Sequence, residues 1–510
     1  MAEVVASAPG KVLITGGYLV LERPNAGLVL STTARFYSVV KPLREELLPE
    51  SWAWSWTDVR VTAPQLLRET TYKLSLKNST LQCNSSRESR NPFVEQAVQY
   101  VVAATKGIFT DKTRKDALDK LLLKGLDITI LGCNDFYSYR NQIEARGLLL
   151  TPETLAAIPP FSSITLNVED SNGTAGSKPE VAKTGLGSSA AMTTSVVASL
   201  LHYLGAVNLP LSTKNLPEEK STNSDLDLVH IIAQSAHCIA QGKIGSGFDV
   251  SAAVYGSQRY VRFSPSVLSS AQVGGMYLPD VITDILQEKW DHEKHKFSLP
   301  PLMTLLLGEP GTGGSSTPSM VGSVKQWMKA DPEKSQETWR TLAGANSKLE
   351  EQLKLLNKFA GEQTEAYKQI ICTCSGHVHS KWMEQASNEY QESVVKTLLG
   401  AREAFLEIMF HMQRMGKAAG VPIEPESQTR LLDATMDMEG VLLAGVPGAG
   451  GFDAVFSVVL GESTDAVSKA WSSRGVLPLL VREDPRGVSL ETGDPRASEL
   501  SSTISSLEIN

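Results

Sequence analysis

The stretch Lys183-Thr184-Gly185-Leu186-Gly187-Ser188-Ser189-Ala190-Ala191 leads directly into a long run of small and apolar residues that ends near residue 204. That run continues over several helical turns and predicts a mostly buried helix. The two glycines permit backbone angles, and a close approach of a ligand, that a side chain would block. The first turn of a helix also offers unpaired amide hydrogens and the positive end of its dipole. The stretch therefore indicates a phosphate site, although a capped helix after a glycine turn has the same pattern.

Ser188 and Ser189 add hydroxyl groups at the start of this helix. These groups can cap the helix, bind a phosphate oxygen or bind Mg²⁺. The stretch is not the common Gly-x-x-x-x-Gly-Lys-Ser/Thr loop, because no lysine follows the second glycine. On these residues alone, an anion site and a purely structural turn remain equally good interpretations.

The composition of the whole chain sets the broad class. A length of 510 residues allows two to three packed units, and the 42% hydrophobic and 20% charged residues are typical of a globular protein. The net charge of −8 argues against a nucleic-acid or anionic-membrane partner. Five dispersed cysteines favour reduced thiols in an intracellular compartment. No apolar run reaches the roughly 18 residues that a membrane span needs.

The pattern along the chain predicts two domains and a tail. Residues 1–297 alternate β-prone segments with helices such as 91–104 and 226–239, and form the proposed nucleotide-binding domain. A new strand follows residue 300, so residues 298–482 form the second domain, with helices at 332–361 and 387–419. The second of these helices is expected to break near Gly400. Residues 483–510 are rich in Ser, Glu, Pro and Gly and are expected to be a disordered tail.

Two further glycine-bearing segments strengthen the interpretation of the first stretch as a phosphate loop. One is Ala8-Pro9-Gly10-Lys11-Val12-Leu13-Ile14-Thr15-Gly16-Gly17-Tyr18, and the other is Gly445-Val446-Pro447-Gly448-Ala449-Gly450-Gly451-Phe452-Asp453. Three such motifs in this order resemble the GHMP kinase superfamily of galactokinase, homoserine kinase, mevalonate kinase and phosphomevalonate kinase. The resemblance implies an α+β fold with a ribosomal S5-like amino-terminal domain and a ferredoxin-like carboxyl-terminal domain, with the active site between them.

Within that superfamily the chain is most similar to the phosphomevalonate kinase family of fungal and plant type. The similarity also rests on Gly245-Ser246-Gly247-Phe248-Asp249-Val250 and on Gly313-Gly314-Ser315-Ser316-Thr317-Pro318-Ser319-Met320. It implies transfer of the ATP γ-phosphoryl group to (R)-5-phosphomevalonate, which gives (R)-5-diphosphomevalonate and ADP in the mevalonate pathway of isoprenoid and sterol biosynthesis.

The resemblance also implies roles for residues that match the family motifs. Lys11 matches the lysine that contacts the reacting oxygens, Asp249 matches the catalytic aspartate, and Ser189 matches the serine that binds Mg²⁺. The resemblance implies that ATP binds to the loop residues Gly185, Leu186, Gly187, Ser188, Ser189 and Ala190. We add the neighbouring cation Lys183 to this group. The candidate substrate-binding residues are Ser315, Ser316, Thr317, Lys243, Arg259, Gly448, Ala449 and Gly450.

One position departs from the mevalonate kinase relatives. Those enzymes carry a Mg²⁺-binding glutamate on the helix before the aspartate, and the nearest positions here are His237 and Cys238. Neither side chain is a good ligand for a hard cation that prefers oxygen. The second protein ligand for Mg²⁺ therefore stays open.

If the acceptor is a phosphate, catalysis needs cations more than it needs a general base. A phosphate monoester has a second pKa of about 6 and is largely ionised at neutral pH. Phosphoryl transfer then depends on positioning and on neutralising negative charge. We therefore expect Lys11 to bridge the two phosphates and Asp249 to orient Lys11.

Three other functions remain open at this point: a mevalonate or sugar kinase of the same superfamily, a diphosphomevalonate decarboxylase, and a non-catalytic nucleotide sensor. The expected partners are ATP and the small-molecule substrate, with no nucleic acid, no membrane and a monomeric chain. The ending Glu508-Ile509-Asn510 is not a Ser-Lys-Leu-type signal, so a cytoplasmic location is expected, with the peroxisome as the alternative.

Overall fold

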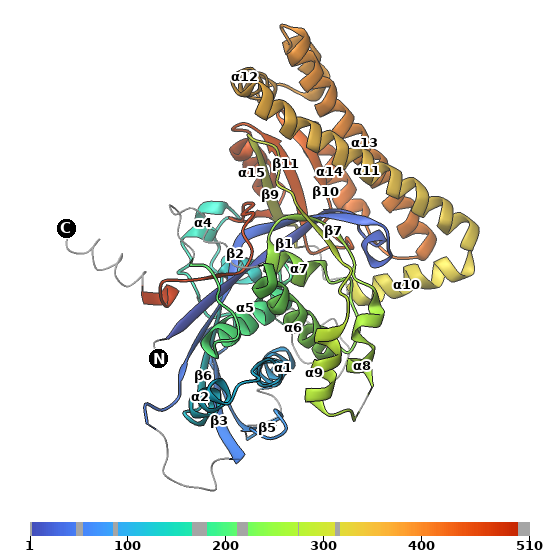
Figure 1. Cartoon of the computed structure of the whole chain (residues 1–510). Helices are drawn as coiled ribbons and strands as arrows, with labels where there is room; N and C mark the ends of the chain where they lie inside the picture. Colours follow the sequence, from blue (N-terminus) through green and yellow to red (C-terminus); the bar gives the residue numbers. More distant parts are fainter. Residues whose placement is uncertain are drawn as a thin grey trace, which may run out of the picture.

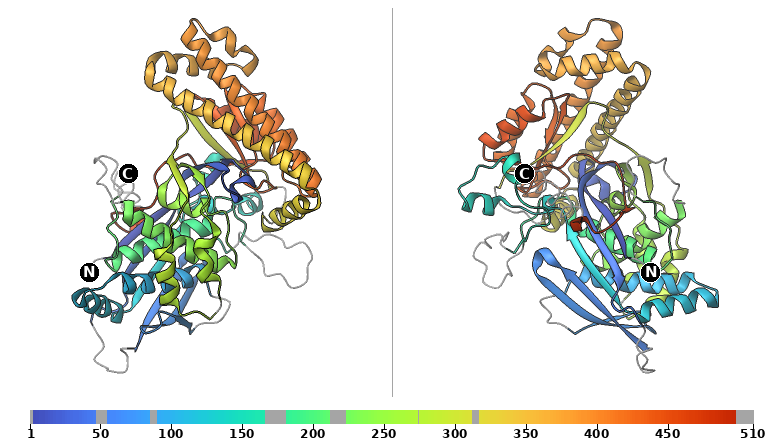
Figure 2. Two further views of the ribbon diagram at one scale, coloured as in Figure 1. Left: turned by 45° about the vertical axis from the view of Figure 1, so that its right-hand side comes forward. Right: turned by 90° about the vertical axis from the view of Figure 1, so that its left-hand side faces the viewer.

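The structure is a computed structural model that describes residues 3–46, 55–84, 90–165, 181–211, 223–273, 275–311 and 317–497 (Figure 1). Within these residues, nine strands form one sheet and four strands form a second sheet. Helices pack against both sheets, and the helix-rich carboxyl-terminal half lies on one side of the larger sheet (Figure 2). The expected α+β class is confirmed.

The larger sheet is organised around two long strands at the start of the chain. Its strands are β1 (Val4–Thr15), β2 (Ala26–Pro42), β3 (Trp56–Ala63), β4 (Arg68–Ser75), β5 (Leu81–Cys83), β6 (Leu126–Gly132), β7 (Gln258–Val261), β8 (Glu293–Lys296) and β13 (Ser489–Leu490). Their main order is β13-β1-β2-β6-β3-β4-β5, and β7 pairs with both β2 and β8. Among the described strands, β3 and β6 run parallel and the other neighbours run antiparallel.

Helices of the amino-terminal half cover this sheet and hold the predicted phosphate loop. They are α1 (Pro92–Ile108), α2 (Lys112–Leu123), α3 (Arg140–Ala145), α4 (Pro152–Ala156), α5 (Ser188–Tyr203), α6 (Asn223–Gln241), α7 (Phe248–Tyr255), α8 (Ser269–Gln272) and α9 (Leu278–Gln287). Helix α5 packs between α1, α6, α7 and the strands β1 and β2. Its small side chains allow this close packing on several sides, and the prediction of a buried helix is confirmed.

The smaller sheet has the strand order β10-β11-β9-β12, with all its neighbours antiparallel. Its strands are β9 (Met303–Glu309), β10 (Val441–Gly445), β11 (Val455–Leu460) and β12 (Leu477–Pro478). The helices that belong to it are α10 (Thr317–Ala330), α11 (Pro332–Glu362), α12 (Thr364–Ser375), α13 (Glu389–Ala419), α14 (Glu426–Met436) and α15 (Thr464–Ser473). With the strands numbered in chain order, the spatial order is 4-1-3-2, which is the ferredoxin-like arrangement that we expected.

The predicted break near Gly400 is wrong. Helix α13 runs from Glu389 to Ala419 without interruption and packs beside α11 (Figure 1). A Cβ at Gly400 would lie only 3.0 Å from Oε1 of Gln352 on α11. The glycine therefore serves close packing between two helices, and this contact outweighs its low helix propensity, which costs about 1 kcal/mol.

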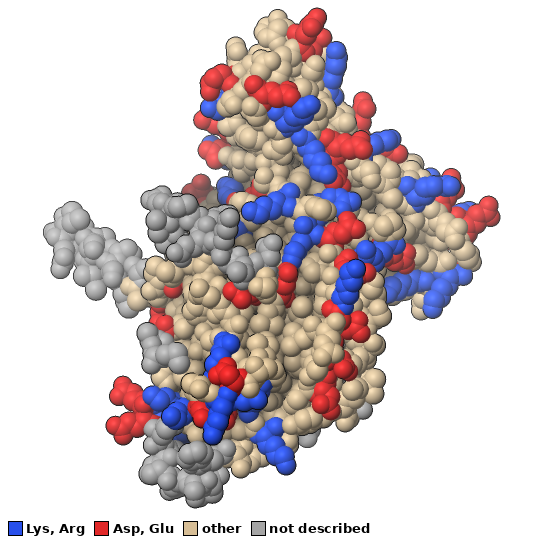
Figure 3. Space-filling model, viewed as in Figure 1, with Lys and Arg blue, Asp and Glu red and all other residues tan. Residues whose placement is uncertain are grey.

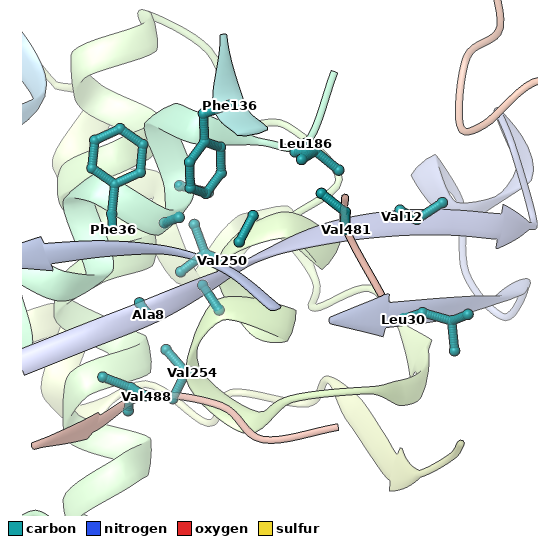
Figure 4. Packing of buried hydrophobic residues seen from close by; sticks show 14 of the residues in the cluster. Ala8, Val12, Leu30, Phe36, Phe136, Leu186, Val250, Val254, Val481 and Val488 are labelled. Carbon is teal, nitrogen blue, oxygen red and sulfur yellow. The ribbon is translucent and has the colours of Figure 1, made fainter. Parts of the chain in front are cut away.

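The predicted disordered tail is also wrong for residues 483–497. Strand β13 pairs with β1, and the Arg35 guanidinium donates a hydrogen bond of 2.6 Å to the Gly487 carbonyl. Val488 is buried beside the start of the chain (Figure 4). Composition predicts disorder for this segment because composition alone cannot show that a buried arginine, distant in sequence, holds it in place. Residues 498–510 lie outside the described residues, and the domain boundary at residue 297 stays a prediction.

Candidate active site

The phosphate loop has the geometry that its glycines predict. Gly185 and Gly187 have φ angles of 74° and 75°, in the left-handed region that side chains disfavour. Gly187 is the N-cap of α5, and the helix receives no side-chain cap. The amides of Ser188 and Ser189 are thus available to an anion, whereas the Ala190 amide donates to the Gly187 carbonyl at 3.1 Å. The alternative of a side-chain-capped helix end is not what the structure contains.

Lys11 reaches the phosphate loop from β1. Its backbone amide donates to the Leu186 carbonyl at 2.9 Å, and its Nζ donates to the Gly185 carbonyl at 2.9 Å. A Cβ at Gly187 would lie 3.0 Å from Cε of Lys11. Gly187 therefore has two roles, because it allows both the left-handed turn and the passage of the lysine side chain.

Asp249 lies in the first turn of α7, close to Lys11. The turn depends on Gly247, whose φ is 81° and whose added Cβ would lie 2.6 Å from the Phe263 ring. Removal from water lowers the pKa of Lys11, and the negative charge of Asp249 opposes that shift. The structure thus brings Lys11 close to Asp249, although they are 238 residues apart in the sequence.

Ser189 contacts His237 rather than a carboxylate. Its Oγ lies 3.1 Å from Nε2 of His237, which is 2% exposed on α6. Burial lowers the pKa of His237, while Asp249 opposes the shift. Cys238 faces elsewhere and accepts a 3.1 Å hydrogen bond from the Gln234 amide. In the part of the chain that the structure describes, no group of three His, Cys, Asp or Glu side chains is placed to hold a metal.

The third glycine motif packs against the first one. The Gly448 amide donates to the Leu13 carbonyl at 3.0 Å, and the Tyr18 hydroxyl donates to the Ala449 carbonyl at 2.9 Å. A Cβ at Gly450 would lie 2.0 Å from the Ile423 carbonyl oxygen. The loop thus joins the smaller sheet to the strand that carries Lys11.

The candidate substrate cations differ in their surroundings. Arg259 lies 3.0 Å from Glu350 and 3.4 Å from Glu293, so two carboxylates already neutralise its charge. Lys243 is exposed in the turn after α6, and Lys183 is exposed just before the phosphate loop. Thr317 begins α10, and its side chain is outside the description. Ser315 and Ser316 lie outside the described residues.

Arg140 and Glu309 were missed by the sequence reasoning. Arg140 donates to the carbonyls of Glu309 at 3.2 Å and Gly475 at 2.7 Å, and Ser138 donates to the Glu309 carboxylate. Burial raises the pKa of Glu309. These contacts tie the amino-terminal half to the end of β9, just before residues 312–316. No local pattern could have found them, because each joins residues far apart in the chain.

The family model described as GHMP kinases N terminal domain matches residues 176–257, which include the phosphate loop, α6 and Asp249. The solved structure of Streptococcus pneumoniae phosphomevalonate kinase in complex with phosphomevalonate and AMPPNP superposes with a TM-score of 0.53. The two share 15% identity over 95% of this chain and 100% of that chain. The fold and the site define a kinase of the GHMP class.

Curated relatives identify the family within this class of kinases. The chain is 63% identical to "Phosphomevalonate kinase, peroxisomal" of Arabidopsis thaliana over 508 residues, 99% of each chain. It is 30% identical to phosphomevalonate kinase erg8 of Aspergillus fumigatus over 501 residues, 92% of this chain and 89% of the relative. The chain belongs to the phosphomevalonate kinase family. Among the residues that the structure describes, no helix is both long and apolar enough to span a membrane.

Proposed function

We propose that this chain transfers the γ-phosphoryl group of ATP to (R)-5-phosphomevalonate, giving (R)-5-diphosphomevalonate and ADP. The observation that carries the proposal is the placement of Lys11, whose Nζ lies 2.9 Å from the Gly185 carbonyl of the phosphate loop. Its charge lies near that of Asp249. The names of the Arabidopsis and Aspergillus relatives support phosphomevalonate as the acceptor.

We assign each residue a role in the reaction according to its charge. The amides at the start of α5 bind the polyphosphate, and Lys11 neutralises the oxygens that pass between donor and acceptor. The negative charge of Asp249 opposes the loss of the Lys11 proton, which burial favours. A strong base is not needed, since the acceptor phosphate is already ionised near its second pKa of about 6.

The residues present fit a magnesium ion. Mg²⁺ prefers oxygen ligands and keeps several waters, and the site offers the Ser189 hydroxyl and the Asp249 carboxylate. When bound, the ion neutralises charge on the nucleotide phosphates. Ser189 is the protein ligand that we propose.

The acceptor is proposed to lie between the phosphate loop and the third glycine motif. Lys183 and Lys243 are exposed beside the loop and are available to anionic groups. We retain Ser315, Ser316 and Thr317 and the segment 448–450 as substrate contacts. We do not retain Arg259, because Glu350 and Glu293 pair with its charge.

The test is an ADP-release assay with purified chain, with and without Mg²⁺, on mevalonate, phosphomevalonate and diphosphomevalonate. We expect ADP release with phosphomevalonate only, and only with Mg²⁺. Turnover of mevalonate alone would instead identify an alcohol kinase, and carbon dioxide release from diphosphomevalonate would identify a decarboxylase. ATP binding with no turnover of any acceptor would leave a nucleotide sensor.

We further propose that the enzyme acts as a monomer in the cytoplasm, with the peroxisome as the alternative. The Arabidopsis relative carries "peroxisomal" in its name, which supports the alternative. Fluorescent fusions at each end of the chain, imaged with a peroxisomal marker, separate the two locations. Light scattering measures the mass in solution.

A further inference from the structure

His237 has an unusual position for a buried histidine. It lies on α6, is 2% exposed, and directs Nε2 at the Ser189 hydroxyl at a distance of 3.1 Å. Its ring packs against the Phe93 ring with centroids 5.3 Å apart. The packing fixes the imidazole, so its hydrogen bond to Ser189 is preorganised before any ligand binds.

A second contact favours one direction for this hydrogen bond. A serine hydroxyl can donate or accept, and a neutral imidazole nitrogen does one or the other. The amide nitrogen of Gln241 lies 3.4 Å from the same Nε2 of His237, and an amide nitrogen only donates. An unprotonated Nε2 is compatible with both neighbours, since it accepts the 3.1 Å hydrogen bond from Ser189 and only a weak one from Gln241 at 3.4 Å. Ser189 then spends its single proton on His237 and keeps its lone pairs for another ligand.

We propose that His237 is a positioning residue that accepts a hydrogen bond from the Ser189 hydroxyl and thereby turns the serine oxygen's lone pairs toward the Mg²⁺ of a bound nucleotide. The inference rests on the proposed function, because it takes a magnesium nucleotide as the ligand of the phosphate loop. His237 itself does not touch the metal or the reacting phosphates.

The advantage to the site is one of orientation. An unheld serine hydroxyl rotates freely, and ordering it on binding costs conformational entropy. A hydroxyl that already donates to His237 presents its oxygen to a cation without that cost. The imidazole also adds no negative charge beside the phosphates.

The test uses four variants: His237→Phe, His237→Gln, Ser189→Ala and the double variant Ser189→Ala/His237→Phe. Phenylalanine keeps a ring against Phe93 but cannot accept a hydrogen bond. Glutamine keeps an acceptor at a similar distance from the backbone. Isothermal titration of ADP and of a non-hydrolysable ATP analogue, with and without Mg²⁺, measures the metal-dependent gain in affinity, and kcat/KM for ADP release is measured alongside.

We expect His237→Phe to reduce the Mg²⁺-dependent gain in affinity about tenfold, the equivalent of one hydrogen bond, with little change in metal-free binding. His237→Gln should retain most of the gain. In the Ser189→Ala background, His237→Phe should have no further effect, because the group through which it acts is gone.

Two results would overturn the proposal: an equal loss of affinity with and without Mg²⁺, or an undiminished effect of His237→Phe in the Ser189→Ala background. Circular dichroism and thermal melting check that each variant folds. If His237→Phe does not fold, His237→Asn replaces it, because the shorter amide cannot reach Ser189. The titrations contain no acceptor, so failure of the chain to phosphorylate phosphomevalonate would defeat the proposed function and leave this test valid.

Discussion

The two glycine-rich loops of this enzyme look alike in sequence and differ in what their backbones do. In the phosphate loop, a Cβ at Gly185 would meet no atom within 4 Å, and α5 has no side-chain cap. In the loop after β10, the Gly448 amide binds the Leu13 carbonyl, and the Gly451 amide binds the Ile423 carbonyl at 2.8 Å. The amides at the start of α5 are not engaged by a side-chain cap, whereas the Gly448 and Gly451 amides form hydrogen bonds inside the protein.

The difference shows that glycine spacing alone does not identify a phosphate site. At Gly185 an added Cβ would enter open space, whereas at Gly450 it would collide with the Ile423 carbonyl oxygen. What separates the two functions is where each amide hydrogen goes. Charge on the outer surface does not separate them either, because Lys and Arg are interspersed with Asp and Glu over the helical half (Figure 3).

The largest expected effect tests the first loop. Lys11→Met removes the cation that contacts the Gly185 carbonyl, and should lower kcat about a thousandfold, as loss of a group that stabilises transition-state charge does. Nucleotide affinity should change far less. Lys396→Met, on the exposed side of α13, is the matched control. Near-normal turnover by the Lys11 variant would remove this lysine from the mechanism.

The next effect tests the second loop. Gly450→Ala places a Cβ 2.0 Å from the Ile423 carbonyl oxygen at a φ of 75°. The collision and the strained backbone should lower the free energy of unfolding by about 3 kcal/mol. Urea denaturation measures it. A stable variant with weakened nucleotide binding would mean that this loop contacts the nucleotide and not only the acceptor.

A smaller change in stability should accompany the same substitution in the first loop. Gly185→Ala meets open space but keeps a φ of 74°, so it should cost about 1 to 2 kcal/mol of folding free energy. Its main effect should be a higher KM for ATP, because the strained loop presents its amides less well. Denaturation and steady-state kinetics should show that Gly185→Ala mainly raises the KM for ATP and that Gly450→Ala mainly lowers stability. If both variants changed the KM and the stability to the same extent, the two loops would not differ in function.

The smallest effect concerns the side chain that holds the second loop. Tyr18→Phe removes the 2.9 Å hydrogen bond to the Ala449 carbonyl and should destabilise the protein by about 1 kcal/mol. Thermal melting detects the shift, and Tyr277→Phe, which removes an exposed 3.0 Å hydrogen bond to the Lys77 carbonyl, serves as the control. A loss of turnover without a loss of stability would place the Tyr18 hydroxyl among the substrate contacts.

Much of the fold and of the site could be predicted because the signals are local. The phosphate loop, α5 and the charged residues Lys11 and Asp249 stand in motifs of a few residues each, whose backbone needs are visible as glycine. Gly400 and residues 483–497 were misread for the converse reason. Their roles depend on Gln352 on another helix and on Arg35 on β2, which composition and propensity do not register.

The sequence by itself determined that a glycine turn opens a buried helix, and it predicted that this turn binds phosphate beside a lysine and an aspartate. Only the tertiary structure decided that His237, not Cys238, faces Ser189, and that Arg259 is neutralised by Glu350 and Glu293. The physical reason is that backbone conformation is set by neighbours in the chain, whereas the direction of a side chain and the pairing of a charge are set by packing between distant segments.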